Sequence, residues 1–197
     1  MNVSESQGPR VVHWMKQTDM EQDTDGAIIR RAKTEDADRI GELWLALLEE
    51  QAERDARIGV ADDALSRWQN DFPMWLDDDT RRVFVAEVDG TIQGFASAHR
   101  WGPPPIYAES SEVYLDEIYV APEARRCGLG SQLVEAVREW AEGLGSERVR
   151  LQVLAENDDA HGFWNACDAV PLVVTRAIEC EPSEEAAEDE GSGKIGF

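Results

Sequence analysis

The chain has 197 residues with 41 acidic and 19 basic side chains, which gives a formal net charge of −22 at pH 7. A surface of this sign repels the phosphates of nucleic acids and of anionic lipids, so we expect neither a nucleic-acid partner nor a membrane partner. Polyamines and basic peptides would be attracted. Acids over the whole surface are more typical of a halophilic protein in high salt, where charges are strongly screened, so the charge says little about the substrate.

The cysteines indicate neither a disulfide framework nor a metal site. Cys127, Cys167 and Cys180 are odd in number and scattered, without the spacing of zinc ligands. No apolar stretch approaches the roughly 18 residues of a membrane span, and the N-terminus lacks the basic-then-apolar pattern of a signal peptide. These features predict a soluble, cytoplasmic protein without a bound metal.

The distribution of polar residues predicts one domain between two tails. Residues 1–25 are polar and irregular, and residues 181–197 are acidic and then rich in glycine and serine. Both segments are expected to be flexible. Residues 26–180 are expected to form the folded domain, because the chain is long enough for one sizeable core.

In chain order, the domain begins with a strand at 27–31 and two helices. Thr34 is expected to cap the first helix, and the second is expected to stop near Pro73. Asp89-Gly90 predicts a hairpin between strands at 83–88 and 91–100. The first helix has an apolar stripe at helical spacing that consists of Ile40, Leu43, Trp44, Leu47 and Leu48.

The second half of the domain alternates strands and helices, which predicts a right-handed parallel crossover. The expected elements are a loop at 101–107, a strand at 112–120, a helix from Gly128 that ends at Gly143 or Gly145, a strand at 148–154, a short helix from Asn157 or Asp158 to Cys167, and late strands at 170–180.

The turn after the strand at 112–120 contains Arg125-x-x-Gly128-x-Gly130. The first N–H groups of a helix have no partner inside it, and glycines let a phosphate approach them, so the turn is a candidate pyrophosphate site. Gly130 is followed by Ser131 and Gln132, without the lysine of a nucleotide-hydrolase loop. The third glycine of a dinucleotide loop is also missing. A plain turn with a helix cap is the alternative at this point.

Two ordered signatures resemble the GNAT superfamily of N-acyltransferases, which use acetyl-CoA. The first is Val120-Ala-Pro122 followed by Arg125-Arg-Cys-Gly128-Leu-Gly130, and the second is Leu151-Gln-Val153 followed by Asn157-Asp-Asp-Ala160-His-Gly-Phe163-Trp164. The resemblance implies an α/β GNAT fold with a mixed central sheet of about six or seven strands and about four helices. The sheet is expected to be splayed between the strands at 112–120 and 148–154.

By this resemblance, acetyl-CoA is the co-substrate and lies with its pantetheine arm in the gap between the splayed strands. The pyrophosphate is expected on the backbone N–H groups of the turn, and Arg125 is expected both to fix the turn and to contact a phosphate. Cys127 is not expected to be a nucleophile, because the family transfers acyl groups directly. The residues expected to contact the cofactor are Ile118, Tyr119, Val120, Arg125, Arg126, Cys127, Gly128, Leu129, Gly130, Ser131, Asn157, Ala160 and Trp164.

The reaction needs a neutral amine, and because a free alkyl amine has a pKa of about 10.4, a general base is expected. The strand around residues 114–120 resembles that of polyamine acetyltransferases, in which adjacent acids serve as base and amine contact. We expect Glu117 as the base, with Asp116 as the second candidate. Successive strand residues face opposite sides, so only one of the two is expected to face the site. A backbone N–H near Ile118 is expected to polarise the thioester carbonyl. A pair of exposed charges without a catalytic role is the alternative.

Several residues depart from the family pattern. Trp164 stands where the family has a tyrosine that protonates the departing thiolate, and an indole cannot supply that proton. His161, one turn earlier, is the alternative donor, although a helical surface histidine is the more typical interpretation. Asp168 replaces a glycine at a helix end, where a left-handed conformation suits glycine better. Gln152 disfavours the subfamily that acetylates ribosomal-protein N-termini, which has glutamate there.

We therefore expect an enzyme that acetylates a primary amine of a small molecule or peptide. A polyamine, a metabolite, an antibiotic and a peptide all stay open as acceptors. Two alternatives are a catalytically silent acyl-CoA-binding module, to which Trp164 points, and a structural protein that binds no CoA. The family often forms homodimers through its late strands, so a homodimer is a further expectation. Trp44 is expected in the core, and Trp101 and Tyr107 either stack on the acceptor or close the loop.

Overall fold

The computed structural model describes residues 26–102, 111–178 and 180. Of these residues, those up to Asn157 form one compact unit, and those from Asp158 form a second. The elements of the first unit are β1 (Ala27–Arg31), α1 (Ala37–Arg54), α2 (Ala64–Asp77), β2 (Arg81–Val88), β3 (Thr91–Trp101), β4 (Glu112–Val120), α3 (Leu129–Gly143) and β5 (Arg148–Arg150), and the second unit contains α4 (Asp158–Ala166).

Some expectations fall outside the described residues. Both tails, at 1–25 and 181–197, lie there, as does most of the loop at 101–107. The flexibility of the tails and the boundaries of the domain stay predictions.

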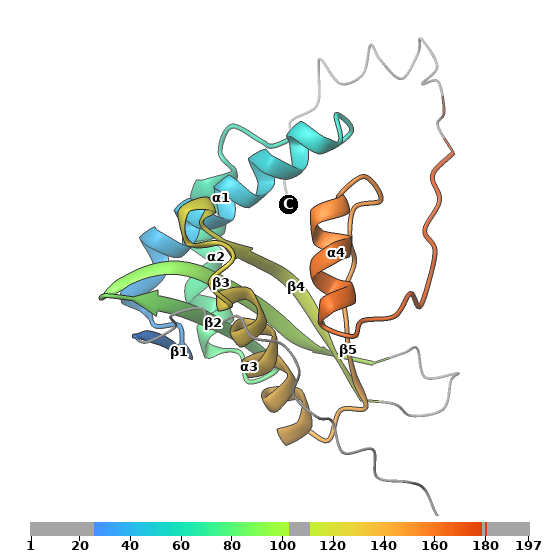
Figure 1. The fold of residues 1–197 in the computed structure, drawn as a ribbon. Coiled ribbons are helices and arrows are strands. Elements are labelled where there is room, and N and C mark those ends of the chain that lie inside the picture. The colour runs from blue at the N-terminus through green and yellow to red at the C-terminus, as the bar shows by residue number, and fades with distance from the viewer. Residues whose placement is uncertain (1–25, 103–110, 179, 181–197) are drawn as a thin grey trace, which may run out of the picture. The chain divides into compact units, whose positions relative to one another are not determined.

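One sheet, in the order β1-β2-β3-β4-β5, forms the centre of the first unit (Figure 1). β1, β2, β3 and β4 pair antiparallel in sequence, and β4 pairs parallel with β5. The parallel pair follows from the crossover through α3, as the alternation of strands and helices predicts. The mixed sheet with its α-helices has the expected α/β architecture.

The sheet has five strands in the part of the chain that the structure describes, so the expectation of six or seven is wrong there. Residues 170–178, expected as late strands, contain none, and β5 ends at Arg150 instead of residue 154. A strand needs a neighbour to complete its hydrogen-bond ladder, so the β propensity of these residues does not suffice. The large apolar side chains that stay exposed there are Val170, Leu172, Val173, Val174 and Ile178.

Helices cover both faces of the sheet, with α1 and α2 on one face and α3 on the other (Figure 1). The main core lies on the α1/α2 face, where Ile40, Phe72 and Phe95 are almost fully buried. α3 covers the opposite face through Leu129, Leu133, Val137 and Ala141. No helix in the described ranges combines the length and the apolar composition that a membrane crossing needs.

The hairpin and the second helix show one correct and one wrong prediction. Asp89 and Gly90 form the β2–β3 turn with φ of 50° and 77°, as the sequence predicts. α2, however, continues through Pro73 to Asp77. A proline removes one hydrogen bond of the helix, but Phe72 is fully buried and stacks on Trp68 at 4.6 Å. This packing holds the helix together beyond the proline.

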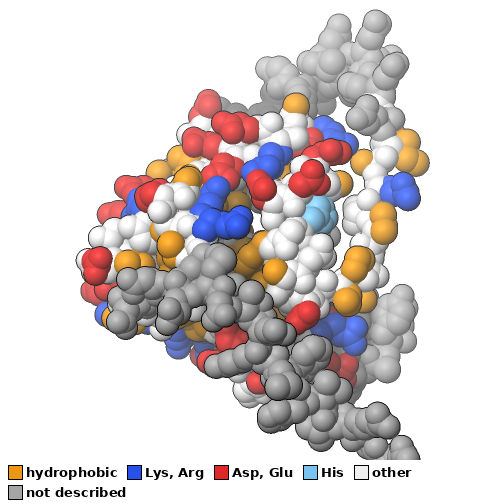
Figure 2. All heavy atoms as spheres, viewed as in Figure 1, with side chains coloured by type: hydrophobic (Ala, Val, Ile, Leu, Met, Phe, Trp, Pro, Cys, Tyr) orange, Lys and Arg blue, Asp and Glu red, His pale blue; other side chains and the backbone are white. Residues whose placement is uncertain are grey.

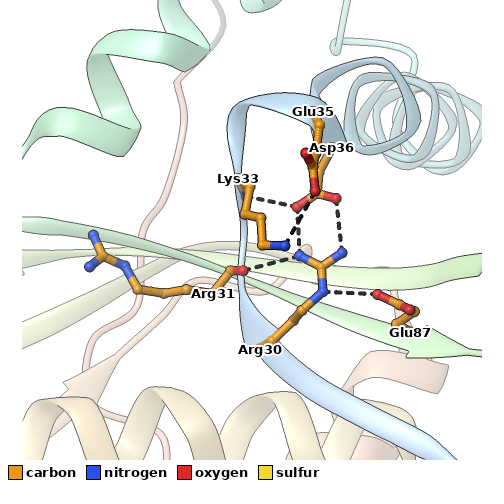
Figure 3. A network of polar contacts seen from close by, with 6 residues as sticks. All are labelled: Arg30, Arg31, Lys33, Glu35, Asp36 and Glu87. Carbon is orange, nitrogen blue, oxygen red and sulfur yellow. Dashed lines mark hydrogen bonds and ion pairs between the residues drawn. The ribbon is translucent and has the colours of Figure 1, made fainter. Parts of the chain in front are cut away.

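A network of ion pairs joins β1, β2 and the chain before α1 (Figure 3). Arg30 Nη1 and Nη2 donate to the two oxygens of Asp36 at 2.7 and 2.9 Å, and Arg30 Nε donates to Glu87 at 2.8 Å. The hydrogen bonds from Arg30 hold the pKa of the Asp36 carboxyl below its usual value, although burial opposes them. The network fixes the position of α1 relative to the sheet.

The start of α1 differs from the expected cap at Thr34. Thr34 lies in a short 3-10 helix (Thr34–Asp36), and α1 begins at Ala37. Asp36 organises this start instead, because its carboxylate accepts the Lys33 backbone N–H at 2.7 Å as well as the Arg30 guanidinium. The tertiary ion pair thus decides which polar residue takes the role.

Candidate active site

β4 and β5 separate after three paired positions. β5 pairs only with residues 112–114, while β4 continues to Val120, so the edge of β4 from Leu115 to Val120 has no strand partner among the described residues. This confirms the splayed sheet that the sequence predicts, although the second strand is shorter. The result is an open backbone edge that can pair with an extended ligand.

The direction of the backbone groups along this edge follows from the β3 ladder. Ala121 N–H donates to the Gln93 carbonyl on β3, and the Tyr119 carbonyl faces Gly94 on the same strand. Successive residues of a strand point their N–H and C=O groups to alternate sides. The backbone groups of Ile118 and Val120 therefore face the open edge, whereas those of Tyr119 belong to the sheet.

Arg125 hydrogen-bonds to one of these backbone groups, the Val120 carbonyl, and also connects the turn to α1. Its Nε donates to the Val120 carbonyl at 2.8 Å, its Nη2 donates to Glu50 at 2.7 Å, and its guanidinium lies 5.1 Å from the Tyr119 ring centre. Tyr119 Oη also donates to Glu50, at 2.6 Å. The expected turn-fixing role of Arg125 is present in this geometry, and Glu50 is the carboxylate through which it reaches α1.

The contacts among Glu50, Tyr119 and Arg125 shift the pKa values of Glu50 and Tyr119 in opposite directions. Burial alone would raise the pKa of the Glu50 carboxyl, but the hydrogen bonds from Tyr119 and Arg125 outweigh it and hold the pKa below its usual value. Burial and the hydrogen bond to Glu50 raise the pKa of the Tyr119 hydroxyl to about 12. Glu50 is therefore ionised and Tyr119 neutral at pH 7.

The turn ends at Gly128, which precedes the first residue of α3. Arg126 and Gly128 both have positive φ, 68° and 80°. Gly128 offers no side chain to cap the helix, and the first turn of α3 carries no acid. The N–H groups of Leu129, Gly130 and Ser131 have no partner within the helix. An acid-free helix start in a chain with 41 acids is suited to an anion.

A β-bulge changes how the two candidate acids face. Glu117 pairs with Ser97 on β3, but Leu115 pairs with the next residue, Ala98, so Asp116 is the extra residue of β4. Glu117 contacts Ser97 and Asp116 contacts His99, two positions further along the same face of β3. Both acids therefore lie on the α1/α2 face, and the expectation that only one of them would is wrong, because simple alternation fails at a bulge.

Glu117 is enclosed by two donors. Ser97 Oγ–H donates to its Oε2, and Trp44 Nε1–H donates to its Oε1 at 3.4 Å. Burial raises the pKa of the Glu117 carboxyl above its usual value, and the nearby Asp116 charge adds to this, while the Ser97 and Trp44 hydrogen bonds oppose it. A carboxylate with a raised pKa is a stronger proton acceptor than an ordinary one.

Asp116 already has two partners. His99 Nδ1 lies 2.9 Å from each of its oxygens, and Arg81 Nη1 lies 3.4 Å from Oδ2. Tyr114 continues this cluster, with its ring centre 5.7 Å from that of His99. Of the two acids, Glu117 is thus the one that contacts no basic side chain in the described part of the chain.

Four residues of the site are not marked by the sequence: three lie around the two candidate acids, and one lies at the turn. Ser97, His99 and Arg81 come from β2 and β3, and no local motif marks them; the hairpin register is the signal that could have placed them opposite β4. Glu50 sits among other acids of α1 and is equally unmarked. Trp44 packs against the core, as expected, and its indole N–H also donates to Glu117.

The second unit contains α4 and the left-handed residue that ends it. Asn157 comes directly before α4, as expected of a capping residue, and α4 carries Ala160 and Trp164. The rings of Phe163 and Trp164 meet edge to face at 4.9 Å. Asp168 has a φ of 59°, and the next N–H, of Ala169, donates to the Trp164 carbonyl at 3.0 Å, so the helix ends in a left-handed residue without the family's glycine.

A family model described as the acetyltransferase (GNAT) family matches residues 43–168. The chain belongs to this family. The match includes both candidate acids, the glycine turn and α4. The residues described bring together no group of three or more side chains that could hold a metal ion.

Similar proteins agree with the assignment. The thialysine N-epsilon-acetyltransferase of Bos taurus is 37% identical over 82 residues, which is 42% of this chain and 48% of that enzyme, so the chain matches about half of its length. An uncharacterised N-acetyltransferase of Archaeoglobus fulgidus is 28% identical over 71% of this chain and 90% of its own. Among solved structures, a Bacillus halodurans protein has a TM-score of 0.70 at 20% identity, over 78% of this chain and 99% of that one. An aminoglycoside N-acetyltransferase in complex with CoA has a TM-score of 0.60 at 24% identity, over 78% and 95%.

Proposed function

We propose that this GNAT protein transfers the acetyl group of acetyl-CoA directly to a primary amine of a small molecule or peptide. The observation that carries the proposal is the open edge of β4, which leads to an acid-free helix start and has the half-buried Glu117 beside it. The chemistry that acetyl-CoA supplies is an activated thioester.

The cofactor side of the proposal rests on backbone groups. The N–H and C=O groups of Ile118 and the N–H of Val120 face the open edge and are suited to pair with the pantetheine arm. The N–H groups from Arg126 to Ser131 would hold the pyrophosphate. Because Arg125 already donates to Glu50 and Val120, its main part is to position this turn. The roles of Asn157, Ala160 and Trp164 on the cofactor stay proposals.

In the proposed reaction, Glu117 accepts the proton of the amine. The amine nitrogen forms a bond to the thioester carbonyl carbon, the C–S bond breaks, and the thiolate leaves with the electron pair. Ser97 and Trp44 hold the carboxylate in place through this step. An N–H at the open edge near Ile118 would stabilise the oxyanion. Asp116 would orient His99 and Arg81, with which it is paired, and would not take the proton.

The acceptor is an amine whose identity the family leaves open. The cattle relative is named for thialysine and a solved neighbour for aminoglycosides, which are both amines. The net charge of −22 supports assays in high salt, since the surface is rich in acids (Figure 2). We propose a cytoplasmic protein of a salt-adapted cell, in which activity rises with salt concentration.

The test replaces the proposed base. Glu117→Gln keeps the shape of the side chain: its oxygen can accept from Trp44 and its NH2 can donate to the Ser97 hydroxyl. It cannot accept the proton, so kcat should fall by about 10²–10⁴. CoA release with a panel of amines in high salt measures kcat, and calorimetry with acetyl-CoA should give an unchanged Kd. Glu139→Gln, an exposed acid of α3, is the matched control.

Two outcomes would contradict the proposal in different ways. A Glu117→Gln variant with the kcat of the wild-type protein would show that another group takes the proton. A wild-type protein that binds acetyl-CoA but acetylates no amine would be the catalytically silent acyl-CoA-binding module.

A further inference from the structure

Arg81 stands at the start of β2, opposite His99 on β3. Its guanidinium lies 5.0 Å from the Trp75 ring centre, and only its Nη1 reaches an acceptor in the described chain, Asp116 at 3.4 Å. A guanidinium has five N–H donors, so most of them are unused. The side chain is 23% exposed, which leaves the guanidinium accessible to a small ligand.

The acids beside Arg81 are unequal as partners for a cationic substrate. Asp116 lies between His99 Nδ1, 2.9 Å away, and the Arg81 guanidinium. A second ammonium group of an acceptor would therefore find this carboxylate occupied and would meet the charge of Arg81. Among the described residues, the donors that contact Glu117 are the neutral Ser97 and Trp44, so this carboxylate can receive the reacting amine.

The side chains of Arg81 and Glu117 lie on the same face of the sheet, close enough to affect the same bound acceptor. Burial dominates the raised pKa of Glu117, and among the opposing influences is the charge of Arg81, so the two groups lie within electrostatic reach of each other. Both are on the α1/α2 face of the sheet, where Asp116, His99 and Tyr114 are titratable neighbours. Asp78, just before β2, also lies within electrostatic reach of Arg81. This face thus offers one carboxylate for an amine and one guanidinium fork.

A guanidinium fork binds a carboxylate, like a phosphate, through two parallel N–H···O bonds. Resting on the proposed acetyltransferase function, we propose that Arg81 is a specificity residue that selects acceptors with a carboxylate in addition to the amine. An ω-amino acid then places its terminal amine at Glu117 and its carboxylate at Arg81. A diamine of the same chain length lacks the second contact and places a cation there.

The experiment compares acceptors that differ only in the carboxylate. L-lysine and cadaverine form one pair, and L-ornithine and putrescine form a second with a shorter chain. For the wild-type protein, kcat/KM should be at least about tenfold higher for the amino acid than for its diamine, in whichever of the two pairs is acetylated faster. Arg81→Met should remove this preference by raising KM for the amino acid, while cadaverine and putrescine are acetylated at least as well as before.

A matched control and a conservative variant separate specificity from stability. Arg82→Met removes a guanidinium next in sequence that lies over Trp140 of α3, on the opposite face, and should leave the preference unchanged. Arg81→Lys keeps the charge without the fork and should retain part of the preference. Thermal unfolding of each variant shows whether it is folded.

The results can overturn the proposal without touching the proposed function. If the wild-type protein prefers the diamines, or if Arg81→Met lowers kcat/KM equally for both members of a pair, Arg81 holds only the protein structure and the proposal is wrong. The same follows if other amines are acetylated but neither amino acid is. If acetyl-CoA binds and no amine of any kind reacts, the proposed function fails, and this proposal fails with it.

Discussion

The turn before α3 and the α1/α2 face of the sheet, which flank the open edge of β4, offer different kinds of groups to a ligand. The turn offers backbone groups, and the α1/α2 face offers side chains. On the turn side, the groups that face outward are backbone N–H groups at the start of α3, and Arg125 holds the turn from behind. On the α1/α2 side, the groups are side chains: Asp116 contacts the bases Arg81 and His99, whereas the donors that contact Glu117 are the neutral Ser97 and Trp44. Backbone recognition depends on the conformation of a few residues, whereas the acceptor side depends on which side chains are present.

This difference implies different sensitivities to substitution. A change on the turn side should affect acetyl-CoA binding through backbone geometry and leave the proton-transfer step intact. A change on the acceptor side should alter the pH dependence or the choice of amine and leave the Kd for acetyl-CoA unchanged.

The largest effect on the turn side is expected for Gly128→Val. Gly128 has a φ of 80°, which a β-branched residue adopts only with strain, and the added side chain would cover the N–H groups of α3. The Kd for acetyl-CoA should rise about 100-fold, which corresponds to about 2.7 kcal/mol. Isothermal titration calorimetry measures it.

Gly143→Ala is the control for this prediction, because Gly143 lies in the same helix with open space around it. Its Kd should equal that of the wild-type protein. A Gly128→Val variant with unchanged affinity would mean that acetyl-CoA does not use the start of α3.

The same contrast explains what could be predicted from the sequence. The glycine turn, the hairpin at Asp89-Gly90 and the crossover through α3 are local patterns, and each of them appears in the structure. The face of the sheet on which the Asp116 side chain lies could not be predicted, because it depends on a β-bulge in the pairing of β4 with β3. The donors to Glu117 come from α1 and β3, which are distant in sequence, so only tertiary packing brings them together.

On the acceptor side, Ser97→Ala should change the pH dependence. The hydrogen bond from Ser97 favours the charged form of Glu117 and so lowers its pKa; without it, burial and Asp116 raise the pKa further. A base works in its deprotonated form, so the acidic limb of kcat/KM against pH should move to higher pH. On that limb, the activity of the variant should lie below that of the wild-type protein at the same pH.

Ser66→Ala, at an exposed position of α2, should leave the profile unchanged. The Kd for acetyl-CoA should be the same for all three proteins. A limb that moved to lower pH, or did not move, would argue against Glu117 as the titrating base.

A smaller effect is expected at Glu50, which links the two sides because it joins α1 to the turn. Glu50→Gln removes the charge that Arg125 and Tyr119 contact at 2.7 and 2.6 Å, so the turn should be held less firmly although its N–H groups are intact. We expect KM for acetyl-CoA to rise by about three- to tenfold, as for the loss of a partly exposed charged hydrogen bond, with kcat nearly unchanged. Glu49→Gln, at the exposed neighbouring position, is the control and should have no effect. A fall in kcat at constant KM would instead place Glu50 on the acceptor side. The distinction between a turn that binds acetyl-CoA through its backbone and a face that binds the amine through side chains would then be wrong.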